Sequence, residues 1–159
     1  MTWPEVDAQI KQGVCAFLPI GSIEQHGPIG LIGTDTICAE AVASPAATIA
    51  YSIVAPVITY TPAPFNTGFP GTVSITPELL TALVVQICQG LLTQGFLDVY
   101  IVNGHGANLS PISRALADLP KGAVKVQSWW VQEPVNTLRQ TLYGDWEGVH
   151  ATPFLSKVI

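Results

Sequence analysis

Apolar residues along this chain gather in short segments between stretches rich in polar and turn residues. Such segments cover residues 14–20, 53–58 and 96–102, and the mixed segment 124–131 predicts a further strand. Runs of this length, bounded by turn residues, are typical of strands that are buried on both faces of a parallel sheet. Pro56 lies within the second run, and because proline cannot donate a ladder hydrogen bond, we expect that strand near an edge of the sheet.

Helix signals fill segments between these runs. Thr-Pro-Glu at 76–78 forms a helix start, apolar residues then recur at helical spacing, and Gly95 predicts the helix end. The Ala-rich segment 35–47 predicts another helix, which Pro45 should kink or end, and a short helix should open at Ser110. Alternating strands and helices predict an α/β fold with a mostly parallel sheet, helices on both faces and right-handed crossovers.

Two further segments have an expected place in this fold. Residues 59–72 contain three prolines, so we expect a long ordered loop, and loops of this length are often functional. Trp129 and Trp130 lie in the predicted strand 124–131, where they either alternate as core and cover residues or form a lid over a substrate. We favour the core and cover interpretation.

Composition narrows the class of protein. The chain has 159 residues, enough for a single domain with a substantial core. Apolar residues make up 48% and charged residues 11%, which favours a sheet buried on both faces or a large subunit interface. No apolar run approaches the ~20 residues of a membrane span, and the first residues do not resemble a signal peptide. We therefore expect no membrane partner.

Charge and cysteine content point in the same direction. The net charge is −5 and the six Lys and Arg residues do not cluster, which argues against a nucleic-acid partner. Cys15, Cys38 and Cys88 lie in apolar stretches, and we interpret them as reduced core residues of a cytoplasmic protein.

The candidate chemistry lies at two predicted strand ends. Glu24, His26 and Asp35 follow the first run, and His105 follows the third. Because ligands of open α/β sheets bind beyond the carboxyl ends of the strands, these segments can meet at one crevice. Mixed carboxylate and imidazole ligands suit zinc or manganese, and a pair of such metals is typical of metal-assisted hydrolysis. His150 stands apart and could act as a general acid or base.

Plainer interpretations of the same residues remain open. Glu24 could be a solvated carboxylate, Asp35 could belong to a helix start, and His105 could fill a turn between two glycines. The loop 104–106 before a helix could also bind an anion, as in a flavodoxin-like module. It lacks the glycine spacing of a dinucleotide site and the Gly-Lys-Ser/Thr of a P-loop, and no basic residue supports it.

At these residues the sequence resembles the creatininase (creatinine amidohydrolase) family. The resemblance lies in GSIEQHGP at 21–28, GTDT at 33–36, FPGT at 69–72 and NGHG at 103–106, in the family's order and spacing. It implies a three-layer α/β/α fold, a binuclear zinc or manganese centre and a homo-oligomer, in known members often a hexamer. It also implies hydrolysis of a small amide, such as a cyclic or formyl amide.

The resemblance assigns a role to each candidate. It implies that Glu24 and His105 hold one metal, that His26 holds the other and that Asp35 bridges both. It implies that His150, in VHAT at 149–152, assists proton transfer to the leaving nitrogen.

Several positions depart from the family pattern. The second metal takes a glutamate that corresponds to Ala107 in creatininase itself and to Leu155 in other members, and Glu147 has a different spacing. A histidine common in the proline-rich loop is Asn66 here. Family members also continue beyond the position of Ile159, so we expect 1–159 to be one creatininase-like domain without the usual C-terminal part.

These features favour a metal-dependent amidohydrolase. The alternative is a truncated, non-catalytic relative that keeps the fold and part of the metal site.

Overall fold

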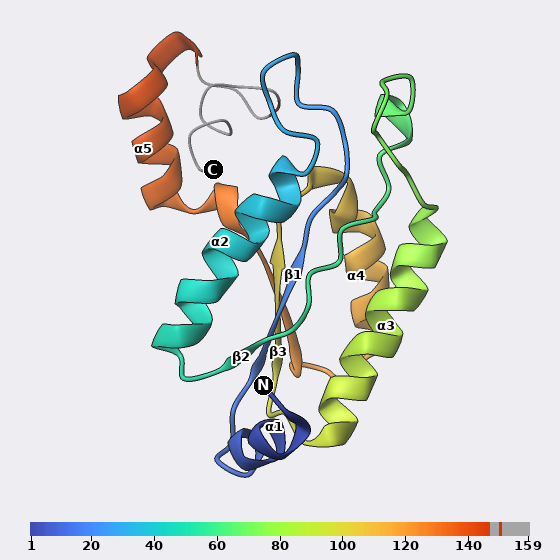
Figure 1. Cartoon of the computed structure of the whole chain (residues 1–159), viewed down its shortest axis with the longest axis vertical. Helices are drawn as coiled ribbons and strands as arrows, with labels where there is room; N and C mark the ends of the chain where they lie inside the picture. The colour runs from blue at the N-terminus through green and yellow to red at the C-terminus, as the bar shows by residue number, and fades with distance from the viewer. Residues whose placement is uncertain (147–149, 151–159) are drawn as a thin grey trace.

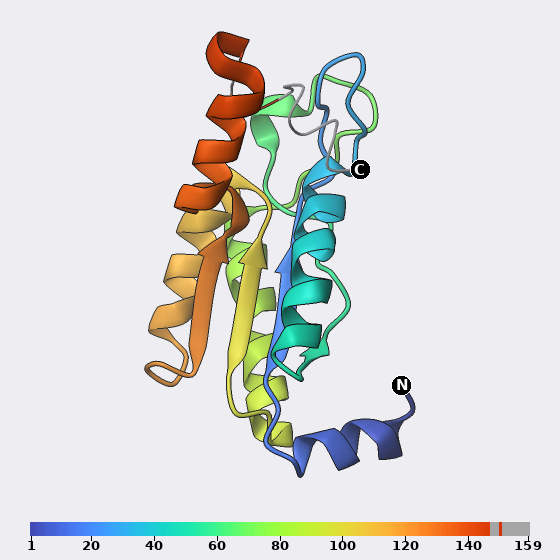
Figure 2. The same ribbon diagram turned by 90° about the vertical axis from the view of Figure 1, so that its left-hand side faces the viewer.

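The computed structural model of this chain describes residues 1–146 and His150, and these contain a four-stranded sheet with helices on both faces (Figures 1 and 2). All strand pairs are parallel, in the order β2-β1-β3-β4. The strands are β1 (Ala16–Ile20), β2 (Ile53–Val54), β3 (Val99–Asn103) and β4 (Val124–Ser128). The predicted α/β fold with a parallel sheet is confirmed, and β2 lies at an edge as Pro56 suggested.

Helices form the layers on either side of the sheet. They are α1 (Trp3–Ile10), α2 (Thr34–Ile49), α3 (Pro77–Gln94), α4 (Leu109–Ala117) and α5 (Glu133–Tyr143), with short turns η1 (Pro64–Asn66), η2 (Gly106–Asn108), η3 (Trp129–Val131) and η4 (Gly144–Trp146). On one face, Leu80 of α3 and Ile112 of α4 pack in a core with Leu18 and Ile101 of the sheet. On the other face, α2 packs against β1 and β3 (Figure 2). The three-layer arrangement is therefore present.

The strand register brings the two candidate segments together. β1 and β3 are neighbours, and Ile20 pairs with Asn103, so both strands end at the same level of the sheet. The chain continues from these ends into the residues around Glu24 and His105. α1 lies at the opposite end, where the strands begin (Figure 1).

The strongest helix prediction is confirmed at both ends. Thr76 caps α3, because its side chain accepts a hydrogen bond from the backbone N–H of Leu79. Gly95 ends the helix with φ of 106°, a left-handed conformation that glycine adopts without strain. α4 begins at Leu109, one residue before the predicted start.

Some boundaries predicted from sequence are wrong. α2 continues through Pro45 to Ile49, because Ala43 and Ala47 on either side of the exposed proline are buried against the sheet. The predicted strand 124–131 ends at Ser128. This residue pairs with Asn103, the last residue of β3, so the residues after Ser128 have no strand to pair with. The predicted strand 53–58 is only two residues long, since Pro56 interrupts its ladder.

The remaining sequence predictions have mixed outcomes. Trp129 is buried beside Cys38 and Trp130 is half-buried, which confirms the core and cover interpretation. Cys38 and Cys88 are buried free thiols as expected, whereas Cys15 is half-buried. The segment 59–72 contains the short turn η1 within an otherwise irregular path. In the described part of the chain, no helix combines the length and apolar character that crossing a bilayer requires.

The first turn of α2 lies directly against the ends of β1 and β3. A Cβ atom at Gly21 would overlap the backbone of Thr36, and a Cβ at Gly104 would overlap the backbone oxygen of Asp35. Glycine at both strand ends therefore permits the close approach of the helix. This contact sets the position of Asp35 relative to both strand ends.

Gly104→Ala should destabilise the fold by about 1–3 kcal/mol, because the added methyl group must displace the first turn of α2. Gly90→Ala is the matched control, since nothing lies within 4 Å of a Cβ added at that position in α3. Alanine has the higher helix propensity, so the control should be neutral or more stable by up to about 1 kcal/mol. Urea denaturation measures both variants, and equal effects would contradict the close approach.

Candidate metal centre

Four ionisable side chains from two strand ends and one helix start meet inside the protein. Glu24 and His26 follow β1, and Asp35 lies in the first turn of α2. His105 follows β3, directly before η2. Their exposed fractions are 1%, 2%, 5% and 6% in that order of the chain. The side chains that the sequence placed at one edge of the sheet are therefore brought together.

Carboxylate oxygens and imidazole nitrogens in this group face one another at short range. His105 Nδ1 lies 2.9 Å from Asp35 Oδ2 and 3.2 Å from Glu24 Oε1. The other oxygen of the aspartate, Oδ1, lies 3.1 Å from His26 Nε2. Asp35 thus contacts both histidines, one with each oxygen.

Backbone carbonyl groups determine which ring nitrogen of each histidine faces the carboxylates. His105 Nε2 lies 3.0 Å from the carbonyl oxygen of Pro62, and His26 Nδ1 lies 3.3 Å from that of Glu24. Because a carbonyl oxygen only accepts, these two nitrogens carry hydrogen and donate it. In the neutral rings, His105 Nδ1 and His26 Nε2 therefore present lone pairs to carboxylate oxygens.

Lone pairs that face one another repel unless a cation lies between them. Glu24 Oε1, His26 Nε2 and Asp35 Oδ2 are buried without a hydrogen-bond partner, despite their short distances to neighbouring polar atoms. A tetrahedral site with metal–ligand bonds of about 2.0–2.1 Å has ligand–ligand edges of roughly 3.3–3.4 Å, close to the spacing here. These donors fit a divalent metal such as zinc or manganese, and Glu24, Asp35 and His105 form one group of three.

Without a metal, protons take the place of the cation. Burial by itself would lower the pKa of His105, but the adjoining carboxylates of Asp35 and Glu24 raise it to about 9. The pKa of His26 is also raised, because the Asp35 carboxylate outweighs desolvation. Desolvation would raise the pKa of Asp35, but the two histidines hold it below its ordinary value.

The side chain of Asn103 holds the turn that presents His105. Asn103 Oδ1 accepts from the backbone N–H of His105 at 3.1 Å and from Asn108 Nδ2 at 3.2 Å. Asn108 Nδ2 also donates to the carbonyl oxygen of Gly21 at 2.9 Å. These bonds tie the turn after β3 to the end of β1.

Asn66 contributes to the site in a way that sequence reasoning missed. Its Nδ2 donates to Glu24 Oε2 at 2.8 Å, and its Oδ1 accepts from Gln25 Nε2 at 3.1 Å. Asn66 therefore holds one oxygen of Glu24, so that the other oxygen faces the histidines. Its place in the proline-rich loop, at a position where the family commonly has a histidine, was the signal that could have identified it.

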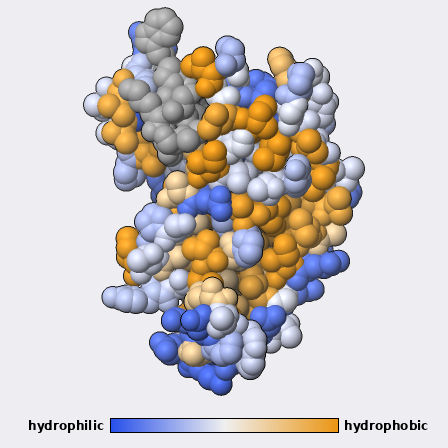
Figure 3. Space-filling view, in the orientation of Figure 1, coloured by the Kyte–Doolittle hydropathy of each residue, from blue (hydrophilic) through white to orange (hydrophobic). Residues whose placement is uncertain are grey.

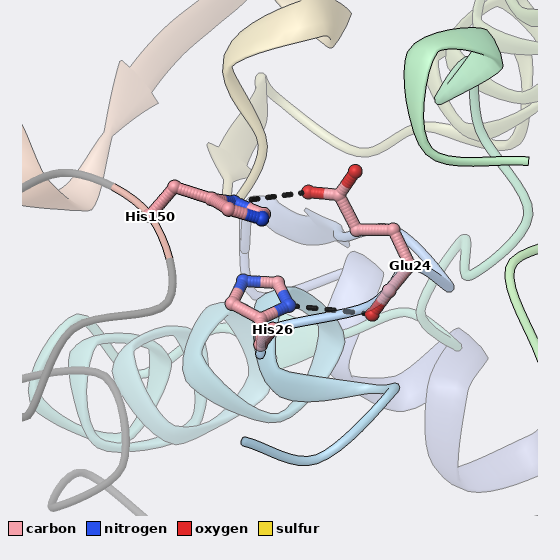
Figure 4. Close-up of side chains that lie close together, drawn as sticks. All are labelled: Glu24, His26 and His150. Carbon is pink, nitrogen blue, oxygen red and sulfur yellow. Dashed lines mark hydrogen bonds and ion pairs between the residues drawn. The ribbon is translucent and has the colours of Figure 1, made fainter. Parts of the chain in front are cut away.

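His150 lies at the rim of the group, with its side chain 37% exposed. Its Nδ1 lies 3.5 Å from Glu24 Oε1, and its ring centroid is 4.5 Å from that of His26. Figure 4 shows the three side chains together. Donor atoms of Glu24, His26 and His150 all lie within 4.8 Å of one another. The structure thus brings all five sequence-predicted site residues into one cluster.

A second metal position would begin with His26 and the Oδ1 atom of Asp35. Ala107 lies in η2 and offers no ligand atom. Glu147 and Leu155, the other positions considered from sequence, lie outside the described residues.

Comparison with known proteins gives a consistent result. The model of the creatininase family, described as creatinine amidohydrolase, matches residues 1–156. The chain is 33% identical over 107 residues to 3-dehydro-scyllo-inosose hydrolase of Thermotoga maritima, covering 67% of this chain and 34% of that protein. It is 37% identical over 106 residues to mycofactocin precursor peptide peptidase of Mycolicibacterium smegmatis, covering 63% and 42%.

A third relative matches over almost the whole chain. It is creatinine amidohydrolase of Pseudomonas putida, 29% identical over 175 residues, with 97% of this chain and 66% of that protein covered. The chain therefore spans 34–66% of the length of these three relatives.

Solved structures of similar fold include a mutant creatininase with a TM-score of 0.82 and 26% identity, which covers 95% of this chain and 66% of that one. A structure named "Creatininase Mn" has a TM-score of 0.80 and 26% identity, with the same coverage. A mutant creatininase of "Zn-Zn type" has a TM-score of 0.79 and 28% identity, and covers 94% and 63%. Those last two names record manganese and zinc in the respective proteins.

The metal-free chain should become less stable as the pH rises from about 6.5 to about 9. The raised pKa of His105 means that the folded state binds its proton more tightly than the unfolded state does. This contribution is complete below the unfolded pKa of about 6.5 and is lost as the pH rises through about 9, up to about 3 kcal/mol. Urea denaturation after treatment with a chelator measures the decline.

The same chain loaded with zinc is the control for this pH series. Its stability should not fall over the same range, because the metal occupies the place of the proton. A flat pH dependence of the metal-free chain would contradict the assignment of His105 as a proton site between two carboxylates.

Proposed function

This chain belongs to the creatininase family, and from that premise we propose that it is a metal-dependent hydrolase that cleaves the amide-type C–N bond of a small cyclic or formyl amide. One observation carries the proposal. Buried carboxylate and imidazole atoms face one another at 2.9–3.2 Å, and three of them have no hydrogen bond. Burying such atoms is costly unless a cation compensates them. The family supplies the reaction class, and the donor atoms supply the reason for a metal.

The proposed ligands divide into two positions. Glu24, Asp35 and His105 hold zinc or manganese at the first, and His26 with the second oxygen of Asp35 begins the other. When bound, such metals polarise a carbonyl oxygen and lower the pKa of water, so that hydrolysis proceeds near neutral pH.

The surrounding residues orient these ligands and move the proton. Asn66 holds Glu24 Oε2, which keeps Oε1 directed into the cluster. Hydrolysis adds the oxygen of water to the carbonyl carbon and breaks the C–N bond, so the leaving nitrogen must gain a proton. His150 is placed to donate it, because its ring lies beside His26 and is exposed to an entering substrate. The four ligands are almost fully buried, which supports a small substrate.

A non-catalytic relative that keeps one metal is the second candidate. Ala107 favours it, because the second metal of creatininase itself takes a glutamate at that place and an alanine side chain cannot ligate. With two protein ligands, the second position falls short of the three that catalytic zinc usually keeps. The two candidates differ in the number of metals that the chain holds tightly.

The exposed surface and the free thiols support an oligomeric state and a cellular location for the proposed enzyme. Apolar side chains gather on the face that carries α3 and the segment before it (Figure 3). Phe69 of that segment and Leu79 of α3 are exposed. Exposure of this kind supports self-association. Free thiols at Cys15, Cys38 and Cys88 support a reducing, cytoplasmic location.

Two variants should distinguish loss of metal from loss of turnover. Asp35→Asn should lose most of the bound metal and all measurable turnover, because it removes a charged ligand shared by both positions. His150→Ala should keep its metal while turnover falls by ~10²–10⁴-fold, as expected for loss of a general acid. Elemental analysis after dialysis and hydrolysis of a panel with creatinine, a formyl amide and a short peptide provide the two measurements.

Asp118→Asn is the matched control for the aspartate, since this residue is exposed at the end of α4. It should retain both metal and turnover. Unchanged metal in Asp35→Asn would place the centre elsewhere, and loss of metal in His150→Ala would make that histidine a ligand.

Ala107→Glu should raise the tightly bound metal from about one to about two per chain, because it adds a third protein ligand at the second position. Ala117→Glu is the control, as this residue is exposed in α4 and remote from the strand ends. Zinc titration with a competing chelator measures the stoichiometry. Two tight metals in the unmodified chain would refute the incomplete second position, and activity gained only in Ala107→Glu would favour the non-catalytic candidate.

A further inference from the structure

A series of hydrogen bonds leads from Glu24 to His150, and its direction follows from the first group in the series. A carboxylate oxygen only accepts, so Asn66 Nδ2 must donate to Glu24 Oε2 at 2.8 Å. The amide of Asn66 is thereby fixed, with its oxygen on the other side. That oxygen accepts from Gln25 Nε2 at 3.1 Å.

A separate hydrogen bond fixes the orientation of the side-chain amide of Gln25. Gln25 Oε1 accepts from the backbone N–H of Gly27 at 2.8 Å, and the backbone N–H of Gln25 donates to Thr72 Oγ1 at 3.0 Å. An amide nitrogen has two hydrogens and donates both. The second hydrogen of Gln25 Nε2 is directed at His150 Nε2, 3.3 Å away. His150 Nε2 must therefore be an acceptor.

We propose that Gln25 is a positioning residue that holds the neutral His150 ring in the tautomer with hydrogen on Nδ1. Nδ1 lies 3.5 Å from Glu24 Oε1, on the side of the ring that faces the ligand group (Figure 4). This inference rests on the proposed function, because it names the ring nitrogen that carries hydrogen in the neutral form of the proposed proton-transfer residue.

The same geometry separates two roles that distance alone does not distinguish. Donor atoms of Glu24, His26 and His150 lie within 4.8 Å of one another, a spacing that also suits three ligands of one ion. A ring nitrogen that carries hydrogen has no lone pair for a metal, and the lone pair of His150 Nε2 accepts from Gln25. His150 is thus a hydrogen-bond donor beside the metal centre and not one of its ligands.

Nitrogen-15 NMR of the histidine rings tests this directly, since the chain has only three histidines. The spectrum is recorded with and without zinc at about pH 8. His150 should show a protonated Nδ1 and an unprotonated Nε2 in both samples. A protonated Nε2 with an unprotonated Nδ1, or a shift of His150 Nδ1 to the metal-bound position on adding zinc, would overturn the proposal.

Gln25→Glu provides the directed variant. A carboxylate only accepts, so the hydrogen on His150 should move from Nδ1 to Nε2, and turnover should fall by ~10²–10⁴-fold toward that of His150→Ala. Gln94→Glu, the same change at an exposed position at the end of α3, should alter neither the tautomer nor turnover. An unchanged His150 tautomer in folded Gln25→Glu would refute the role of Gln25.

The same spectra distinguish this inference from the proposed function. Zinc should shift His26 Nε2 and His105 Nδ1, the two ring nitrogens that face carboxylates. If neither shifts, the proposed metal centre is wrong whatever the tautomer of His150. If both shift while His150 carries hydrogen on Nε2, the metal centre stands and the role of Gln25 is wrong.

Discussion

The close contact between the first turn of α2 and the ends of β1 and β3 is the constraint on which the candidate site depends. Gly21 and Gly104 permit this contact, because a side chain at either position would overlap the backbone of the helix. The contact places Asp35 beside two neighbouring strand ends, where each of its carboxylate oxygens lies close to one histidine. The N-terminal end of a helix also favours a negative charge, so the place of Asp35 suits a carboxylate.

The hydrogen-bond donors and acceptors of this buried site follow one consistent order over several residues. Carbonyl groups take up one nitrogen of His26 and of His105, which turns the other nitrogen toward the carboxylates. Outward from Glu24, the amides of Asn66 and Gln25 continue the same donor and acceptor order toward His150. Each amide in this order has only one orientation that satisfies both neighbours, which explains how a few side chains can fix the tautomer of His150.

The two departures from the family pattern have different consequences in this chain. Asn66 stands where a histidine is common, and its amide is well suited to the place, because it donates to Glu24 while accepting from Gln25. Ala107 offers no ligand atom, so with His150 assigned to hydrogen bonding the second metal position keeps only His26 and Asp35. We therefore expect one metal position with three protein ligands and a second position with only two.

Local patterns in the sequence were sufficient for the elements that depend on neighbouring residues. The cap at Thr76 and the stop at Gly95 determined α3, and glycine-flanked ligands at the ends of two apolar runs indicated a metal site at one edge of a parallel sheet. These signals are local because capping, turn formation and strand burial depend on adjacent residues.

Tertiary structure alone decided the features that depend on residues distant in the chain. α2 continues past Pro45 because its neighbours are buried against the sheet, and β4 ends at Ser128 where its partner strand ends. α1 and α5 were not predicted, although the start of α1 has a local signal, the capping box formed by Thr2 and Glu5. The contacts from Asn66 through Gln25 to His150 span loops far apart in sequence, so only their packing could assign a donor and an acceptor to each atom.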